Sequence, residues 1–103
     1  VADAVAEGKY KRAILFCGTG LGMCICANKV PGVRAAVCHD PFSAERARMS
    51  NNAQILCLGE RVIGVELAKK IVDVWLEAEF SEKSRSQPKV QRIIELEQEH
   101  LKK

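Results

Sequence analysis

A cysteine followed by a glycine-rich loop is the part of the sequence best suited to chemistry. The apolar run Ala13–Cys17 (AILFC) is broken at once by Gly18–Gly22 (GTGLG). Short unbroken apolar runs are typical of strands buried on both faces of a parallel sheet. Such a strand would bring Cys17 to the carboxyl edge of the sheet, where ligands of open α/β sheets bind. The loop glycines would let backbone N–H groups turn inward and, with the N-terminus of the next helix, attract an anion such as a phosphate.

Cys17 is a candidate general base. A thiol close to backbone N–H donors and a helix N-terminus ionises more easily than a free thiol, and the thiolate could remove a proton from a carbon beside a carbonyl. The competing interpretation is a buried strand cysteine that only packs. Packing is the expected role of the other four cysteines, Cys24, Cys26, Cys38 and Cys57. The odd number of cysteines favours reduced thiols, and the lone C-x-C pair gives no metal-ligand spacing, so no metal is expected.

The same loop allows a second interpretation. G-x-G-x-G lacks the spacing of a dinucleotide fingerprint, but Asp40 follows the next apolar run about 20 positions further on, as a ribose-binding carboxylate would. A phosphate- or nucleotide-binding module therefore remains an alternative.

Strand-like and helix-like segments alternate along the chain. The predicted strands are Ala13–Cys17, Arg34–Cys38 and Gln54–Leu58, and the predicted helices are Val1–Glu7, Met23–Asn28, Pro41–Met49, Gly64–Phe80 and Lys89–Lys103. Alternation of this kind predicts an α/β fold with a parallel sheet and right-handed crossovers. We expect one domain over residues 1–103, with its C-terminal helix from about residue 89. Three strands make a small sheet, and AILFC is very apolar for an edge strand. The sequence is therefore expected to be a fragment with further strands on its N-terminal side.

Composition excludes several classes of protein. The net charge is +3, and basic residues alternate with acidic ones, so nucleic-acid binding is not expected. No run reaches the roughly 18 apolar residues that span a bilayer. The first ten residues lack a signal-peptide pattern, which predicts a cytoplasmic protein.

Two long segments carry a resemblance to a known family. ILFCGTGLGMCICANKVPGVRAAVCHD and NNAQILCLGERVIGVELAKKIVDVWL are similar to the ribose-5-phosphate isomerase B / galactose-6-phosphate isomerase family, over residues 13–80. The motifs C-G-T-G-x-G-M, A-N-K-x-P-G-x-R-A and G-x-R-V-x-G-x-E-L-A recur there. The resemblance implies a Rossmann-like three-layer α/β/α domain, a homodimer, and aldose–ketose isomerisation of a phosphorylated sugar without a cofactor.

The resemblance also assigns site residues. Cys17 would move a proton between C1 and C2 of the sugar, while Thr19 and the loop backbone steady the enediolate oxygens. The loop residues are Gly18, Gly20, Leu21 and Gly22. The partner subunit would supply the residues that bind the phosphate end, which correspond to Asn51, Arg61 and, allowing one inserted residue, Arg85 and Lys89. For Arg85 and Lys89, a solvated surface pair is an equal alternative.

Two departures from the family pattern matter. The family's N-terminal strand, which ends in an Asp-His pair that holds the sugar, is absent from this sequence. Ser50 stands where the ribose isomerases carry the histidine that opens the furanose ring, and serine does not titrate near neutral pH. His39, the nearest histidine, is expected to be a satisfied strand-end residue.

Sugar chemistry offers an explanation for Ser50. A tetrose 4-phosphate has its O4 esterified, so it cannot close a furanose ring. Ser50 therefore predicts an open-chain substrate such as erythrulose 4-phosphate. A non-catalytic or half-site subunit of a heteromeric isomerase is the remaining alternative.

Overall fold

The computed structural model describes residues 1–102 and has three strands and five helices in that range. In chain order these are α1 (Ala2–Ala6), β1 (Ala13–Cys17), α2 (Leu21–Asn28), β2 (Ala35–Val37), α3 (Pro41–Met49), β3 (Ile55–Gly59), α4 (Val65–Glu77) and α5 (Gln87–Leu101). The predicted alternation of strands and helices is confirmed.

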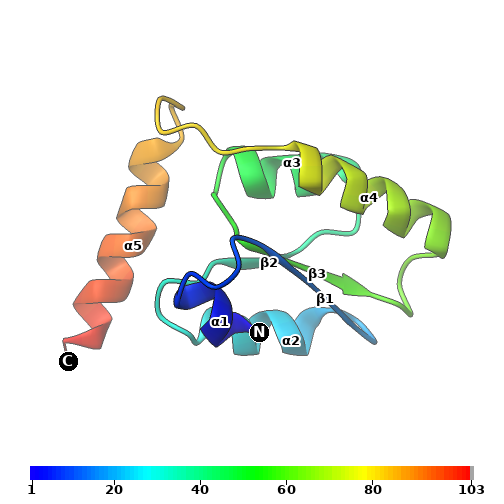
Figure 1. The fold of residues 1–103 in the computed structure, drawn as a ribbon, viewed down its shortest axis with the longest axis horizontal. Helices are drawn as coiled ribbons and strands as arrows, with labels where there is room; N and C mark the ends of the chain where they lie inside the picture. Colours follow the sequence, from blue (N-terminus) through cyan, green and yellow to red (C-terminus); the bar gives the residue numbers. More distant parts are fainter. Residues whose placement is uncertain (103) are drawn as a thin grey trace.

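The strands form one parallel sheet in the order β1-β3-β2. Cys17 lies opposite Gly59 in the register, so the two strands end together at the carboxyl edge. The last strand in the sequence is thus the central one, and each of its five residues is buried. In Figure 1, α1 and α2 lie on one face of the sheet, and α3 and α4 lie on the other.

The side chains of β3 alternate between two apolar clusters. Leu56 and Leu58 pack under α3 and α4, together with Ile71 and Trp75, all fully buried. Ile55 and Cys57 point the other way, toward the helices on the opposite face. A strand covered on both faces reads as a continuous apolar run, because neither set of side chains meets water.

Three helices have a boundary two or more residues away from the predicted one. Helix α2 begins at Leu21, two residues before the predicted start, because Gly20 takes a left-handed conformation (φ 83°) and turns the chain directly into the helix. Helix α5 begins at Gln87 rather than Lys89, since Pro88 fits in the first turn, where no amide donor is needed. Helix α4 ends at Glu77, short of the predicted Phe80.

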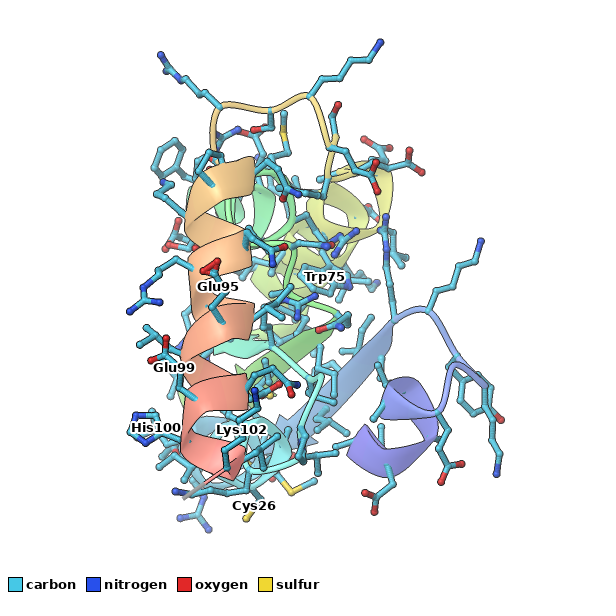
Figure 2. All side chains as sticks on the ribbon, turned by 90° about the vertical axis from the view of Figure 1, so that its left-hand side faces the viewer. Cys26, Trp75, Glu95, Glu99, His100 and Lys102 are labelled. Atoms are coloured by element: carbon cyan, nitrogen blue, oxygen red, sulfur yellow. The ribbon has the colours of Figure 1, made fainter. Side chains whose placement is uncertain are left out.

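Helix α5 stands beside the amino edge of the sheet, on the opposite side from Cys17 (Figure 1). It is attached through buried Val90 and through a hydrogen bond of 2.8 Å from the Gly32 amide to Glu97 Oε1. Figure 2 shows Glu95 and Glu99 on this helix and Trp75 deeper in the molecule. None of the helices within residues 1–102 is long and apolar enough to cross a bilayer.

Candidate active site

Cys17 is the last residue of β1, and the loop after it folds back onto its sulfur. The Gly20 amide donates a hydrogen bond of 2.9 Å to Cys17 Sγ, and the Leu21 amide donates one of 3.3 Å to Thr19 Oγ1. Cys17 is half-buried and Thr19 is exposed. The loop thus presents a backbone donor directly to the sulfur atom.

The N-terminus of α2 adds further donors at the same place. Gly20 is the residue that caps this helix, and the amides of its first turn have no partner within the helix. The helix dipole adds partial positive charge there. The predicted loop residues Gly18, Gly20, Leu21 and Gly22 thus lie together in one turn beside the Cys17 thiol.

Gly59, at the end of β3, packs against the loop at the limit of atomic contact. A Cβ atom on Gly59 would lie 2.6 Å from the carbonyl carbon and oxygen of Thr19. Two backbone hydrogen bonds flank the contact: the Glu60 amide donates to the Cys17 carbonyl at 2.8 Å, and the Arg61 amide donates to the Gly18 carbonyl at 3.0 Å. Gly59 was not among the residues predicted from the sequence, although a glycine directly after a buried strand was a usable signal.

Arg61 lies against the loop of its own chain. A Cβ atom on Gly18 would be 3.6 Å from Arg61 Cδ and 3.7 Å from its Nε. The resemblance had implied that Arg61 acts in the partner's site. Here its side chain and its backbone both adjoin Gly18 of the same chain, and a role of Arg61 in a partner's site stays a prediction.

The other three residues expected to bind the phosphate end do not approach Cys17 within one chain. Asn51 follows α3 at the amino edge, where its Nδ2 donates to the Arg46 carbonyl at 3.3 Å. Asn51 and Ile93 of α5 line a groove of about 490 Å³ along β2. Arg85 precedes α5 and Lys89 lies in its first turn, at the end of the molecule away from the loop (Figure 1).

Ser50 is fixed by a neighbouring arginine. It is the C-terminal capping residue of α3, and its Oγ accepts a hydrogen bond of 3.1 Å from Arg46 Nη1. The guanidinium also lies 3.5 Å from Glu45 Oε1. The position where the resemblance places a ring-opening acid therefore holds a hydroxyl paired with a cation, and neither group supplies a proton near neutral pH.

His39 and Asp40 both have structural partners. His39 Nε2 accepts a hydrogen bond of 2.9 Å from the Gly59 amide, so the expectation of a satisfied strand-end histidine is confirmed. Asp40 caps α3: its carboxylate accepts 2.7 Å bonds from both the hydroxyl and the amide of Ser43. These two bonds lower the pKa of Asp40. A carboxylate used in this way is a poor ribose ligand, which weakens the dinucleotide alternative.

The remaining cysteines differ in burial. All five are free thiols. Burial, with a smaller contribution from Asp40, raises the pKa of Cys38 to about 11, and burial likewise raises the pKa of Cys57. Buried thiols of this kind are inert. Within residues 1–102 no group of three or more potential ligands is arranged to hold a metal ion.

Comparison with known proteins identifies the family. The Ribose/Galactose Isomerase family model matches residues 1–93. The chain belongs to this family. It is 62% identical over 93 residues to D-erythrulose-4-phosphate isomerase of Pectobacterium atrosepticum, covering 90% of this chain and 60% of that protein. It is 53% identical over 96 residues to D-erythrulose-4-phosphate isomerase 2 of Mycolicibacterium smegmatis, covering 93% and 63%.

Solved structures agree with this assignment. Ribose-5-phosphate isomerase B of Clostridium thermocellum superposes with a TM-score of 0.92 at 52% identity, covering 97% of this chain and 67% of that one. The predicted fold, a Rossmann-like three-layer α/β/α domain whose parallel sheet lacks the N-terminal strands, is thereby confirmed. The chain spans about three-fifths of the length of the erythrulose-phosphate isomerases it matches.

Proposed function

We propose that the protein is an aldose–ketose isomerase of a phosphorylated sugar, with Cys17 as its general base. The observation that carries the proposal is the hydrogen bond of 2.9 Å from the Gly20 amide to Cys17 Sγ, in a loop that also presents the N-terminus of α2. Membership of the Ribose/Galactose Isomerase family supports the same reaction class. A cytoplasmic setting, in which five free thiols stay reduced, is part of this proposal.

The proposed chemistry is a proton shuttle between adjacent carbons. The Cys17 thiolate removes the proton from the carbon beside the carbonyl, and the electron pair moves onto the carbonyl oxygen to give an enediolate. The hydroxyl proton of that carbon then passes to the former carbonyl oxygen, the thiol returns its proton to the former carbonyl carbon, and the new carbonyl forms on the carbon that was deprotonated. The Thr19 hydroxyl and the first-turn amides of α2 would stabilise the oxygen on which charge develops, and such stabilisation is a major part of the rate enhancement of many enzymes. No cofactor enters this scheme.

We further propose that the substrate is an open-chain tetrulose phosphate, of the erythrulose 4-phosphate type. Ser50 supports this, because neither its hydroxyl nor its Arg46 partner can act as the acid that opens a furanose ring. Two relatives at 62% and 53% identity are named D-erythrulose-4-phosphate isomerases. A pentose phosphate is the competing substrate, because the chain is also 50% identical to ribose-5-phosphate isomerase B of Escherichia coli.

A homodimer would complete the site. Asn51, Arg85 and Lys89 lie at the other end of the molecule from Cys17, so in a single chain they cannot share a ligand with it. A second copy could bring its own amino edge to this loop. A paralogous chain could do the same, as the half-site alternative requires.

The test uses the full-length protein in D₂O with erythrulose 4-phosphate and ribose 5-phosphate in turn. Proton NMR follows isomer formation and deuterium entry beside the carbonyl. We expect turnover of the tetrulose phosphate alone. Turnover of the pentose phosphate would overturn the substrate proposal, and exchange with neither sugar would favour a half-site subunit.

Two cysteine variants test the role of Cys17 as the general base. Cys17→Ala should lower kcat by at least about 100-fold, the usual contribution of a general base. Cys26→Ala is the matched control, because Cys26 is an exposed free thiol on α2, outside the Cys17 loop. Full activity in Cys17→Ala would exclude the proposed mechanism.

A further inference from the structure

The side chain of His39 takes the place of a missing strand partner. Strand β2 ends at Val37, and the last main-chain bond between the two strands runs from the Cys38 amide to the Cys57 carbonyl at 3.3 Å. The chain then leaves the sheet, because Asp40 caps α3, which begins at Pro41. The next free donor of β3 is the Gly59 amide, and His39 Nε2 accepts its hydrogen bond at 2.9 Å.

Gly59 transmits this restraint to the loop of the proposed base. Its Cα faces the Thr19 backbone with no room for a Cβ, and a Cβ on Gly20 would lie 3.1 Å from the Leu58 carbonyl carbon and 3.3 Å from the Gly59 nitrogen. The backbone atoms of β3 thus touch both Thr19 and Gly20. Gly20 in turn provides the amide that binds Cys17 Sγ.

These contacts connect the start of α3 to the start of α2. His39, just before α3, holds Gly59. Gly59 supports the turn through Thr19 and Gly20, and that turn begins α2 and binds the thiol. Close-packed backbone contacts of this kind transmit small displacements, because there is no soft side chain between them to absorb a shift.

We propose that His39 is a positioning residue for the base: by fixing the Gly59 amide it sets the distance between the Gly20 amide and Cys17 Sγ. This inference rests on the proposed isomerase function and adds a residue that does not touch the substrate. A misplacement of about 1 Å at a reacting group can lower a rate by about 100-fold. A small shift of Gly59 would therefore be visible in kcat.

Three variants separate positioning from mere structural support. His39→Leu removes the acceptor at similar volume, and His39→Asn keeps a polar group that is too short to reach the Gly59 amide. His39→Gln is the rescue variant, because its Oε1 can extend to the position of Nε2. His100→Leu, on the outer helix α5, is the control for loss of a histidine as such (Figure 2).

We expect His39→Leu and His39→Asn to lower kcat by roughly tenfold or more, with KM changed by less than about threefold. His39→Gln should recover most of the lost rate, and His100→Leu should match the wild type. Assays are run well below each variant's unfolding temperature, so that unfolded protein does not contribute. Equal kcat in all variants, or a loss that His39→Gln does not recover, would overturn the proposal.

Two readouts do not depend on turnover. Hydrogen exchange of the Gly59 amide should accelerate in His39→Leu and His39→Asn and return toward the wild-type rate in His39→Gln. The alkylation rate of Cys17, read at its own peptide by mass spectrometry, should change in the same two variants. If the wild type isomerises no sugar phosphate, these measurements still decide whether His39 positions the loop. An unchanged Cys17 alkylation rate despite faster Gly59 exchange would limit His39 to a structural role.

Discussion

The backbone of Gly59 touches the backbone of Thr19, so closely that a Cβ atom on Gly59 would lie 2.6 Å from the Thr19 carbonyl. This contact joins the central strand of the sheet to the loop that follows Cys17. It also explains why the strand must end in glycine, although the φ angle of Gly59 is not among the positive ones. The requirement is one of space rather than of backbone conformation.

Gly59→Ala should therefore damage both stability and the site. We expect the free energy of unfolding to fall by about 1–3 kcal/mol, as in other overpacked interiors, because backbone atoms cannot move aside as a flexible side chain does. Urea unfolding followed by circular dichroism measures this. Gly22→Ala is the control, since a Cβ there meets nothing within 4 Å and the position lies inside α2, where Ala is favoured over Gly. It should not lower the free energy of unfolding. Equal stability of the two variants would show that the loop yields easily.

The buried side chain of Arg48 should stabilise the packing of α3 and α4. Its side chain is 7% exposed, its Nη1 donates a hydrogen bond of 2.7 Å to the Ala53 carbonyl, and its guanidinium lies 5.4 Å from the Trp75 ring centre. Burial is the main cause that lowers its pKa, to about 10, so the charge carries a desolvation cost. Arg48→Met would relieve that cost but leave the Ala53 carbonyl unpaired.

We expect the unpaired carbonyl to dominate, with Arg48→Met losing about 1–3 kcal/mol of unfolding free energy. Arg92→Met is the matched control, because Arg92 pairs with Glu95 and Glu99 on the exposed face of α5. Exposed pairs contribute at most about 1 kcal/mol. Thermal unfolding of both variants gives the comparison. An Arg48→Met protein more stable than the wild type would mean that desolvation outweighs the hydrogen bonds.

Asp40 should make α3 sensitive to acid. Its pKa is lowered in the folded protein by the hydroxyl and amide of Ser43, so folding favours the carboxylate. The resulting stability is complete above the unfolded value of about 3.9 and is lost as the pH falls through the lower, folded value. Asp40→Asn keeps a capping oxygen but does not titrate. Its stability deficit relative to the wild type should thus shrink as the pH is lowered from 6 to 3.

Urea unfolding across this pH range measures the effect, and Ser43→Ala should reduce the pH-dependent part by removing one donor. A constant difference between wild type and Asp40→Asn at all pH values would contradict the assignment.

The buried thiols should resist alkylation in the native protein. Cys38 and Cys57 are 2% and 0% exposed, and their pKa values are raised by burial, so neither access nor ionisation favours reaction at pH 8. Cys26 is exposed on α2 and should react with iodoacetamide well before them. Peptide mass spectrometry gives the order, and all five should react in urea. Labelling of Cys57 as fast as Cys26 would show that β3 opens readily.

Local pattern was enough to predict most elements. Ala13–Cys17 and Pro41–Met49 have the predicted bounds, because an unbroken apolar run and a Pro after a capping Asp are local signals. Predicted β2 was longer than the observed Ala35–Val37, since Arg34 and Cys38 each make one main-chain hydrogen bond to β3 but lie outside the paired register. The pattern of apolar residues indicates which residues are buried, but it does not indicate where the hydrogen-bonded pairing of two strands ends.

Long-range geometry accounts for what the sequence could not show. The order β1-β3-β2, the burial of Arg48 against Trp75 and the bond from Gly59 to His39 all join residues about 20 or more positions apart. The Cys17 loop could be predicted because its residues are consecutive. Arg61 was selected from its motif, but its position beside Gly18 depends on two strands ending at the same level.

The central position of β3 also constrains how the chain can fold as it is made. Within residues 1–102, β1 and β2 pair with β3 and not with each other. Neither β1 nor β2 can therefore pair with β3 until the ribosome has released residues 55–59. Until then the edges of β1 and β2 that face β3 stay unpaired, and unpaired strand edges are prone to aggregate during synthesis. Helices α2 and α3, which need only local contacts, can form in the meantime and cover part of that surface.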